Sequence, residues 1–152
     1  MRIAVACDHG GFPLKKMIME TVTAQGHEPI DFGTFSQESV DYPDFVEKAG
    51  IAIQNKQADR AIIVCGSGVG ACIAANKMKG LYASICHDTY SAHQGVEHDD
   101  MNVLCMGARI IGAELAREIV IAFLNAVFSN GERHVRRVQK TRLLEQKSFL
   151  QE

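Results

Sequence analysis

The sequence lacks the patterns that mark several large classes of protein. Its five cysteines are odd in number and contain no C-x-x-C pair, which argues against a disulfide framework and against a zinc knuckle. The formal net charge is only -2, so no general field attracts nucleic acid or an anionic lipid surface. The apolar stretch at residues 1–7 is too short for a signal peptide or a membrane span. We therefore expect a cytoplasmic protein that binds neither nucleic acid nor membranes.

What is present fits one globular domain. The chain has 152 residues, of which 47% are hydrophobic and 22% are charged, and these values are ordinary for a folded soluble protein. It contains no internal repeat, no low-complexity stretch and no linker. We expect residues 1–152 to form a single domain.

Strand and helix patterns alternate along the chain. This alternation predicts an α/β protein with an open doubly wound, Rossmann-like parallel sheet of about five strands. A polar and basic segment over residues 132–151 then predicts a C-terminal helix that extends beyond the core and contacts a second subunit. The expected strands are residues 2–7, 27–32, 60–65, 81–86 and 103–106, and the expected helices between and after them are residues 12–25, 43–55, 69–79, 91–97 and 113–128.

The most informative segment is a cysteine followed by a glycine-rich loop. Residues 62–64 read as a buried parallel strand, and Cys65 comes directly after it. Gly66, Gly68 and Gly70 allow backbone N–H groups to approach a ligand closely and lead into a helix whose first N–H groups lack partners. Because negative charge is stabilised there, we expect the Cys65 thiol to be partly ionised near neutral pH.

Several interpretations of this loop compete. It could be a tight turn whose glycines only allow close packing. It also fits a loose dinucleotide-binding fingerprint with Asp88 as the ribose ligand, although the loop follows the third strand and the chain is too short for two nucleotide-binding halves. A cysteine phosphatase needs an arginine where Ala71 stands, and the Gly-Lys-Ser/Thr of a Walker A loop is absent. A base or nucleophile beside an oxyanion site remains.

Further candidates also follow strands. Ligands of doubly wound sheets bind at the carboxyl ends of the strands, where Asp8 and His9 follow the first strand and His87 and Asp88 follow the fourth. We assign small buried hydrophobic roles to Cys7, Cys72, Cys86 and Cys105, and ordinary polar roles to His27, His87, His93 and His134.

A set of motifs runs in order along nearly the whole chain. They are Cys7-Asp8-His9-Gly10-Gly11-Phe12, Asp31-Phe32-Gly33-Thr34, Asp41-Tyr42-Pro43, Cys65-Gly66-Ser67-Gly68-Val69-Gly70, Ala74-Ala75-Asn76-Lys77, His98 followed by Asn102, and Gly131 to Arg137. In this order they resemble the type B ribose-5-phosphate isomerases and the related galactose-6-phosphate isomerase subunits. The resemblance implies interconversion of an aldose phosphate and a ketose phosphate through a cis-enediolate, without metal or cofactor.

The resemblance also implies roles for individual residues. Cys65 would move the proton between C2 and C1, Ser67 would help to move the hydroxyl proton, and backbone N–H groups of Gly66, Gly68 and Gly70 would hold the enediolate oxygens. His98 would open the furanose ring. The residues that would hold the sugar are Asp8 and Tyr42, and those that would hold its phosphate are His9, Arg109, Arg133 and Arg137.

In such a family the site is shared between two subunits of a homo-oligomer, a dimer or a tetramer. Arg133 and Arg137 lie four residues apart, so they share one face of the predicted C-terminal helix, which suits a phosphate. Without the resemblance, the same arginines would fit a solvated helix face equally well.

One residue departs from the family pattern. Where the family commonly has His-Asn, this chain has His98-Asp99, and an ionised aspartate cannot donate a hydrogen bond to the sugar. The preferred sugar therefore stays open among ribose 5-phosphate, allose 6-phosphate and galactose 6-phosphate. A non-catalytic, nucleotide-binding α/β domain is the alternative from a different functional class.

Overall fold

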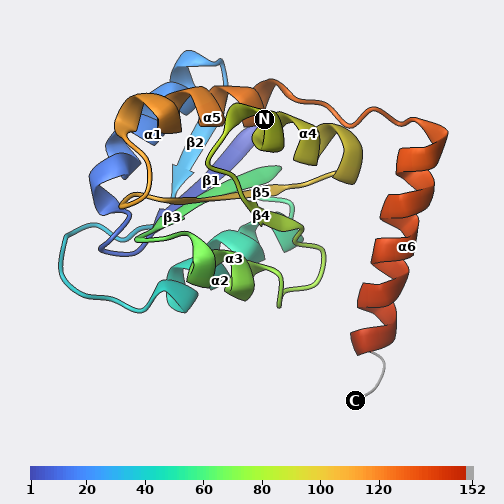
Figure 1. Cartoon of the computed structure of the whole chain (residues 1–152). Helices are drawn as coiled ribbons and strands as arrows, with labels where there is room; N and C mark the ends of the chain where they lie inside the picture. The colour runs from blue at the N-terminus through green and yellow to red at the C-terminus, as the bar shows by residue number, and fades with distance from the viewer. Residues whose placement is uncertain (150–152) are drawn as a thin grey trace.

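The computed structural model describes residues 1–149, arranged as a parallel sheet between two layers of helices (Figure 1). The five strands are β1 (Arg2–Cys7), β2 (Glu28–Asp31), β3 (Arg60–Cys65), β4 (Ala83–Ile85) and β5 (Val103–Gly107), in the order β2-β1-β3-β5-β4. All four strand pairings are parallel. The predicted doubly wound sheet of five strands is confirmed.

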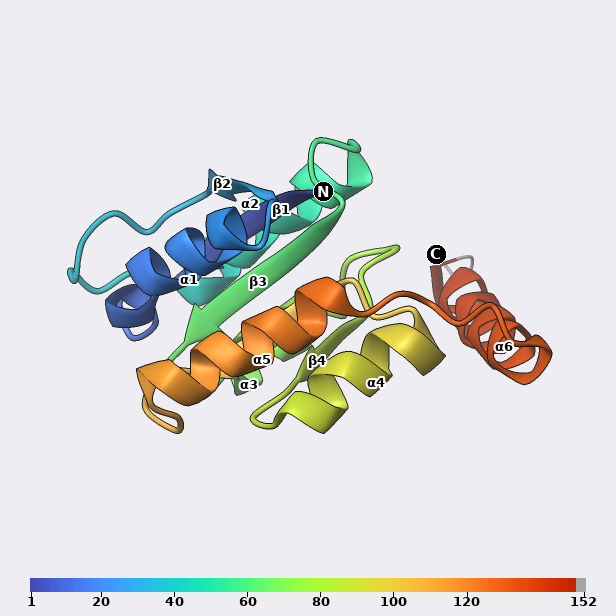
Figure 2. The same ribbon diagram turned by 90° about the horizontal axis from the view of Figure 1, so that it is seen from above.

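Helices cover both faces of the sheet. Figure 2 shows α1 (Phe12–Ala24), α5 (Ala113–Asn125) and α4 (Thr89–Asp99) across one face, while α2 (Tyr42–Gln54) and α3 (Val69–Ala75) lie on the other. The inner strands therefore bury both of their faces, so they read as continuous apolar runs in the sequence. Along β1, Ile3 and Val5 pack into the core beneath α1 and α5, and Ala4 and Ala6 pack into the core beneath α2.

The sixth helix, α6 (Glu132–Phe149), stands away from this body (Figures 1 and 2). Glu145 ties it to the loop before β4, accepting hydrogen bonds from the Gly80 backbone N–H at 2.7 Å and from the Tyr82 hydroxyl at 3.2 Å. Arg142 pairs with Asp100 at the end of α4. The predicted extended helix is confirmed over its described residues, while its expected end at residue 151 lies outside them.

Several predicted boundaries differ because side chains end the helices. Asn76 donates to the carbonyls of Cys72 and Ala83, at 3.1 and 2.9 Å, so the chain turns there and α3 ends four residues before the predicted residue 79. Arg60 donates to the carbonyls of Phe123 and Ala126, at 2.7 and 2.8 Å, where α5 ends. These long-range partners are not visible in local sequence.

The start of α4 has a local cause. The Asp88 carboxylate accepts a hydrogen bond from the Ser91 backbone N–H at 2.6 Å, so the helix begins two residues earlier than predicted. This cap occupies the carboxylate that a dinucleotide-binding loop would direct at a ribose.

Among the described residues, no helix combines the length and apolar character that crossing a membrane requires.

Candidate active site

The loops after β1, β3 and β5 meet at the carboxyl edge of the sheet. The register pairs Cys7 with Val64 and Cys65 with Gly107, so the three strands end side by side. Between their loops lies a cavity of about 430 Å³. It is lined by Asp8, His9, Tyr42, Cys65, Gly66, Ser67, Gly70, Arg109 and Ile110. Most of the predicted site residues are therefore brought together here.

Cys65 is held at the base of this cavity by the glycine loop. Its side chain is almost wholly buried, and its Sγ atom accepts a hydrogen bond from the Gly68 backbone N–H at 3.0 Å. Gly68 has a φ of 84°, a left-handed conformation that residues with a Cβ rarely adopt. The glycine is needed to turn its N–H back onto the sulfur, where a thiolate accepts more strongly than a thiol.

Ser67 and Tyr42 lie on either side of the loop. The Ser67 hydroxyl is near the start of α3, accepting from the Val69 backbone N–H at 3.2 Å, and the residue is exposed. The Tyr42 ring lies so close to Gly70 that a Cβ at that position would be 2.7 Å from the Tyr42 Cζ atom. A residue larger than glycine at position 70 would displace the ring from the cavity.

Three polar side chains complete the wall. Asp8 is buried, and its Oδ1 atom accepts from the Gly11 backbone N–H at 3.0 Å. His9 accepts from the Val40 backbone N–H through Nδ1 at 3.2 Å, so the neutral ring carries its proton on Nε2. The Arg109 backbone N–H donates to the Gly66 carbonyl at 3.0 Å, which anchors this arginine beside the loop. The wall thus offers an imidazole and a guanidinium to an anion.

His98, Asp99, Arg133 and Arg137 do not line this cavity. Because α4 runs antiparallel to the strands, its last residues lie toward the amino edge of the sheet. The next strand, β5, begins at Val103, which pairs with Ala61 near the amino end of β3. Cys65 lies four residues after Ala61 at the carboxyl end of β3, a distance of about 13 Å along the strand. Within one copy of the chain, the residues around Cys65 therefore lie apart from His98, Asp99, Arg133 and Arg137.

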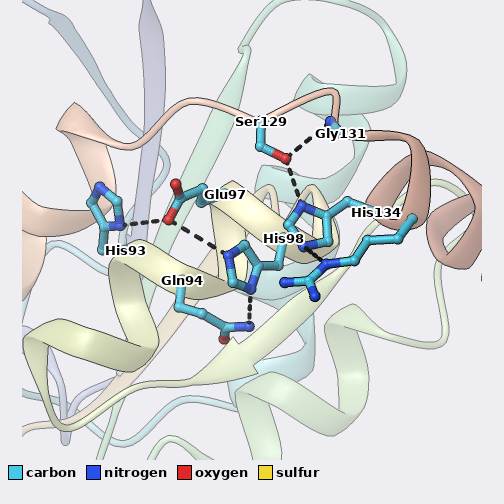
Figure 3. Close-up of polar contacts among 8 residues, drawn as sticks. His93, Gln94, Glu97, His98, Ser129, Gly131 and His134 are labelled. Atoms are coloured by element: carbon cyan, nitrogen blue, oxygen red, sulfur yellow. Dashed lines mark hydrogen bonds and ion pairs between the residues drawn. The ribbon is translucent and has the colours of Figure 1, made fainter.

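Figure 3 shows the polar contacts around His98. Its ring stacks on that of His134, with 4.1 Å between centroids and 28° between planes. Its Nδ1 atom is 2.9 Å from the Gln94 side-chain nitrogen, and its Nε2 atom is 3.8 Å from the Glu97 carboxylate. His134 in turn contacts Ser129 Oγ through Nδ1 at 2.6 Å and Arg133 Nε through Nε2 at 3.1 Å.

Burial and neighbouring charges both act on the pKa of His134. Burial lowers the pKa of His134, and the neighbouring His98, Arg133 and Arg137 lower this pKa further. Asp99 acts weakly in the opposite direction. The lowered pKa favours the neutral form of His134.

Asp99 and Arg137 line a second cavity, of about 410 Å³, between α4, α6 and the edge strand β4. Gln94 lies on the same wall. Neither Gln94 nor Ile110 is among the predicted site residues. Only the four-residue spacing of Gln94 and His98, which share one face of a helix, could have indicated the first of them.

The cysteines confirm the sequence interpretation in three of four cases. Cys7, Cys86 and Cys105 are buried, and burial raises the pKa of both Cys7 and Cys86 to about 11. The prediction is wrong for Cys72, which is only half-buried. A hydrogen bond with Cys105 lowers the pKa of Cys72 to about 7.

Comparison with known proteins places this geometry in context. Residues 3–141 match the family described as Ribose/Galactose Isomerase. The chain is 43% identical over 146 residues to ribose-5-phosphate isomerase B of Escherichia coli (strain K12), covering 96% of this chain and 97% of that protein.

Two solved structures extend the comparison. Ribose-5-phosphate isomerase B of Clostridium thermocellum has a TM-score of 0.93 and 44% identity, over 97% of this chain and 99% of that one. The enzyme of Mycoplasma genitalium with bound ribulose-5-phosphate has a TM-score of 0.88 and 37% identity, over 95% of this chain and 96% of that one.

Proposed function

The chain belongs to the ribose/galactose isomerase family, and from that premise we propose that it interconverts ribose 5-phosphate and ribulose 5-phosphate through a cis-enediolate. The observation that carries the proposal is the cavity in which the Cys65 sulfur lies beside a glycine loop, with its orientation set by the Gly68 N–H. A relative of known structure holds ribulose 5-phosphate, which supports a sugar phosphate as the ligand. Sugar phosphates are charged and do not cross membranes, which fits a cytoplasmic enzyme.

The proton transfer is assigned to Cys65. Its thiolate removes the proton from C2 of the open-chain aldose, the electron pair of that C–H bond forms the C1–C2 double bond, and the π pair of the C1 carbonyl moves onto its oxygen to give the enediolate. Ser67 moves a proton between the two hydroxyl oxygens, and the Cys65 thiol then returns its proton to C1 to give the ketose. Backbone N–H groups of Gly66 and Gly70 stabilise the negative oxygens of the intermediate. Asp8 and Tyr42 hold the remaining hydroxyl groups.

Phosphate binding and ring opening need a second copy of the chain. In one copy, His9 and Arg109 lie at the cavity and offer donors to the phosphate. We assign Arg133, Arg137 and the ring-opening His98 to the neighbouring subunit, because these residues are far from Cys65 within one chain. The outward position of α6 supports this assignment (Figure 1). A homodimer with two shared sites is the smallest assembly that satisfies it.

A coupled assay of the purified protein tests the function. Ribose 5-phosphate, allose 6-phosphate and galactose 6-phosphate are compared by kcat/KM, and we expect ribose 5-phosphate to be preferred. Preference for a six-carbon sugar would overturn the substrate while leaving the isomerase reaction in place. Absence of turnover with all three would refute the proposal and favour a domain that binds ligands without chemistry.

A further inference from the structure

Two residues beside His98 have no part in the reaction proposed above, although both contact its ring. Gln94 meets Nδ1 at 2.9 Å, and His134 stacks on the ring face at 4.1 Å (Figure 3). Gln94 lies one turn before His98 on α4, whereas His134 lies in the first turn of α6. The ring is therefore held at an edge and on a face by two independent contacts.

The partners of His134 determine its tautomer. Arg133 Nε can only donate, and it lies 3.1 Å from His134 Nε2, so that nitrogen must present a lone pair. The neutral ring then carries its proton on Nδ1 and donates it to Ser129 Oγ, 2.6 Å away. Ser129 Oγ also accepts from the Gly131 backbone N–H at 3.2 Å. Protonation of His134 on Nε2 would break its contact with Arg133.

The partner of His98 determines its tautomer in the same way. The Gln94 side-chain nitrogen is an amide donor, so Nδ1 of His98 accepts and the neutral ring carries its proton on Nε2. The nearest acidic group to Nε2 is the Glu97 carboxylate at 3.8 Å, beyond hydrogen-bond distance. The proton on Nε2 is therefore available to a ligand.

We propose that His134 and Gln94 are positioning residues for ring opening, fixing the plane and tautomer of His98 so that its Nε2–H meets the sugar ring oxygen. This inference rests on the proposed function, since His134 and Gln94 contact the residue that we assign to ring opening. His134 has a further effect, because its bond to Nε of Arg133 leaves the two terminal nitrogens of that guanidinium free for phosphate.

The proposed positioning of His98 also depends on a neutral His134. The charged and titratable groups that face it are His98 and Asp99 on α4, and Arg133 and Arg137 on its own helix. In ring opening the bond from C1 to the ring oxygen breaks and the ring oxygen takes the proton of the C1 hydroxyl, while the Nε2–H of neutral His98 donates a hydrogen bond to that oxygen. A protonated His134 would lose its acceptor for Arg133, and with it one of the contacts that hold its ring 4.1 Å from that of His98. Burial, together with the charges of His98, Arg133 and Arg137, lowers the pKa of His134 and so favours its neutral form.

The two directions of the reaction separate ring opening from the enediolate steps. Ribose 5-phosphate is a closed furanose, whereas ribulose 5-phosphate cannot form a five-membered ring because its C5 oxygen carries the phosphate. Turnover of ribose 5-phosphate therefore needs His98. Deuterium uptake from solvent at C1 of ribulose 5-phosphate needs only the Cys65 steps.

Two variants test the inference by this comparison. His134→Phe keeps a stacked ring but loses both hydrogen bonds, and Gln94→Glu replaces the donor at Nδ1 with an acceptor. For each we expect kcat with ribose 5-phosphate to fall at least about tenfold while deuterium uptake with ribulose 5-phosphate stays within about twofold. His134→Phe should also raise KM for both sugars, because Arg133 loses its support. His27→Gln, which removes a histidine outside the contacts between α4 and α6, is the matched control and should change neither rate.

Nitrogen NMR of the imidazoles supplies a readout that a merely structural role would not change. At pH 8 the wild type should show His98 protonated on Nε2 and His134 on Nδ1, and Gln94→Glu should move the His98 proton to Nδ1. If His134→Phe unfolds, Ser129→Ala removes only the hydroxyl acceptor and should release the His134 tautomer with a several-fold loss of ribose 5-phosphate turnover. Equal losses in both reaction directions, or an unchanged His98 tautomer in Gln94→Glu, would overturn the inference. An inactive wild type with the expected tautomers would instead refute the proposed function.

Discussion

The backbone N–H of Gly68 donates to the sulfur of Cys65 across 3.0 Å, and the left-handed conformation of Gly68 is what directs it there. This contact orients the sulfur within the cavity. It gives the proposed base a fixed position before any sugar binds.

Replacement of this sulfur tests its role as the base. Cys65→Ser should lower kcat at least about a hundredfold, because a serine hydroxyl is a much weaker acid and is rarely ionised at neutral pH. The affinity for inorganic phosphate, measured by calorimetry, should stay near that of the wild type, which controls for folding. A near-normal rate in this variant would remove Cys65 from the mechanism.

The shared site is tested by mixing two inactive chains. Arg137→Ala and Cys65→Ser are each expected to be inactive as pure proteins. If each site takes Cys65 from one subunit and Arg137 from the other, random reassembly of a dimer should restore about one quarter of the wild-type activity. Each variant refolded alone is the control. No recovery, or an active monomer by light scattering, would contradict the arrangement.

Asp99 offers a test of substrate choice. Asp99 is exposed and lines the same cavity as Arg137. In the proposed shared site we place its negative charge near the reacting carbons of the sugar. Asp99→Asn should raise kcat/KM for ribose 5-phosphate several-fold and change the preference among sugars, because the charge opposes an enediolate. Glu114→Gln, on the exposed start of α5, removes an equal charge elsewhere. An unchanged substrate profile would show that Asp99 does not tune specificity.

Cys72 gives a pH-dependent prediction. Since its pKa is lowered to about 7, mainly by its hydrogen bond with Cys105, its thiolate fraction rises with pH through neutrality. Alkylation by iodoacetamide, followed by mass spectrometry of peptides, should label Cys72 readily at pH 8 and about tenfold more slowly at pH 6. Cys86, whose pKa is raised to about 11, is the internal control and should stay unlabelled. A flat rate for Cys72 between these pH values would contradict the prediction.

The proposed mechanism also predicts resistance to chelation. Backbone N–H groups stabilise the enediolate in this scheme, and within the described part of the chain no three His, Cys, Asp or Glu side chains gather into a metal site. Exhaustive treatment with EDTA should leave kcat unchanged. Loss of activity, with recovery on adding a divalent cation, would contradict the scheme.

Local sequence determined the elements and the chemistry of the glycine loop. Apolar runs such as residues 60–65 and turns such as Gly66 to Gly70 depend on interactions between near neighbours, so their order predicted the parallel sheet and the cysteine at its edge. The ends of α3 and α5 were missed, because the groups that end them include Ala83 and Arg60, which lie on strands outside these helices.

Tertiary structure decided which candidates belong together. The sequence grouped Cys65 with His98, but the return direction of α4 carries His98 toward the opposite edge of the sheet, so the proposed mechanism takes His98 from a second copy. The stack of His98 on His134 could not be predicted from the sequence, because 36 residues separate these rings along the chain and only the packing of α6 beside α4 joins them. Residue types and local spacing can therefore indicate a chemistry, whereas the directions and packing of whole helices decide which residues can carry it out together.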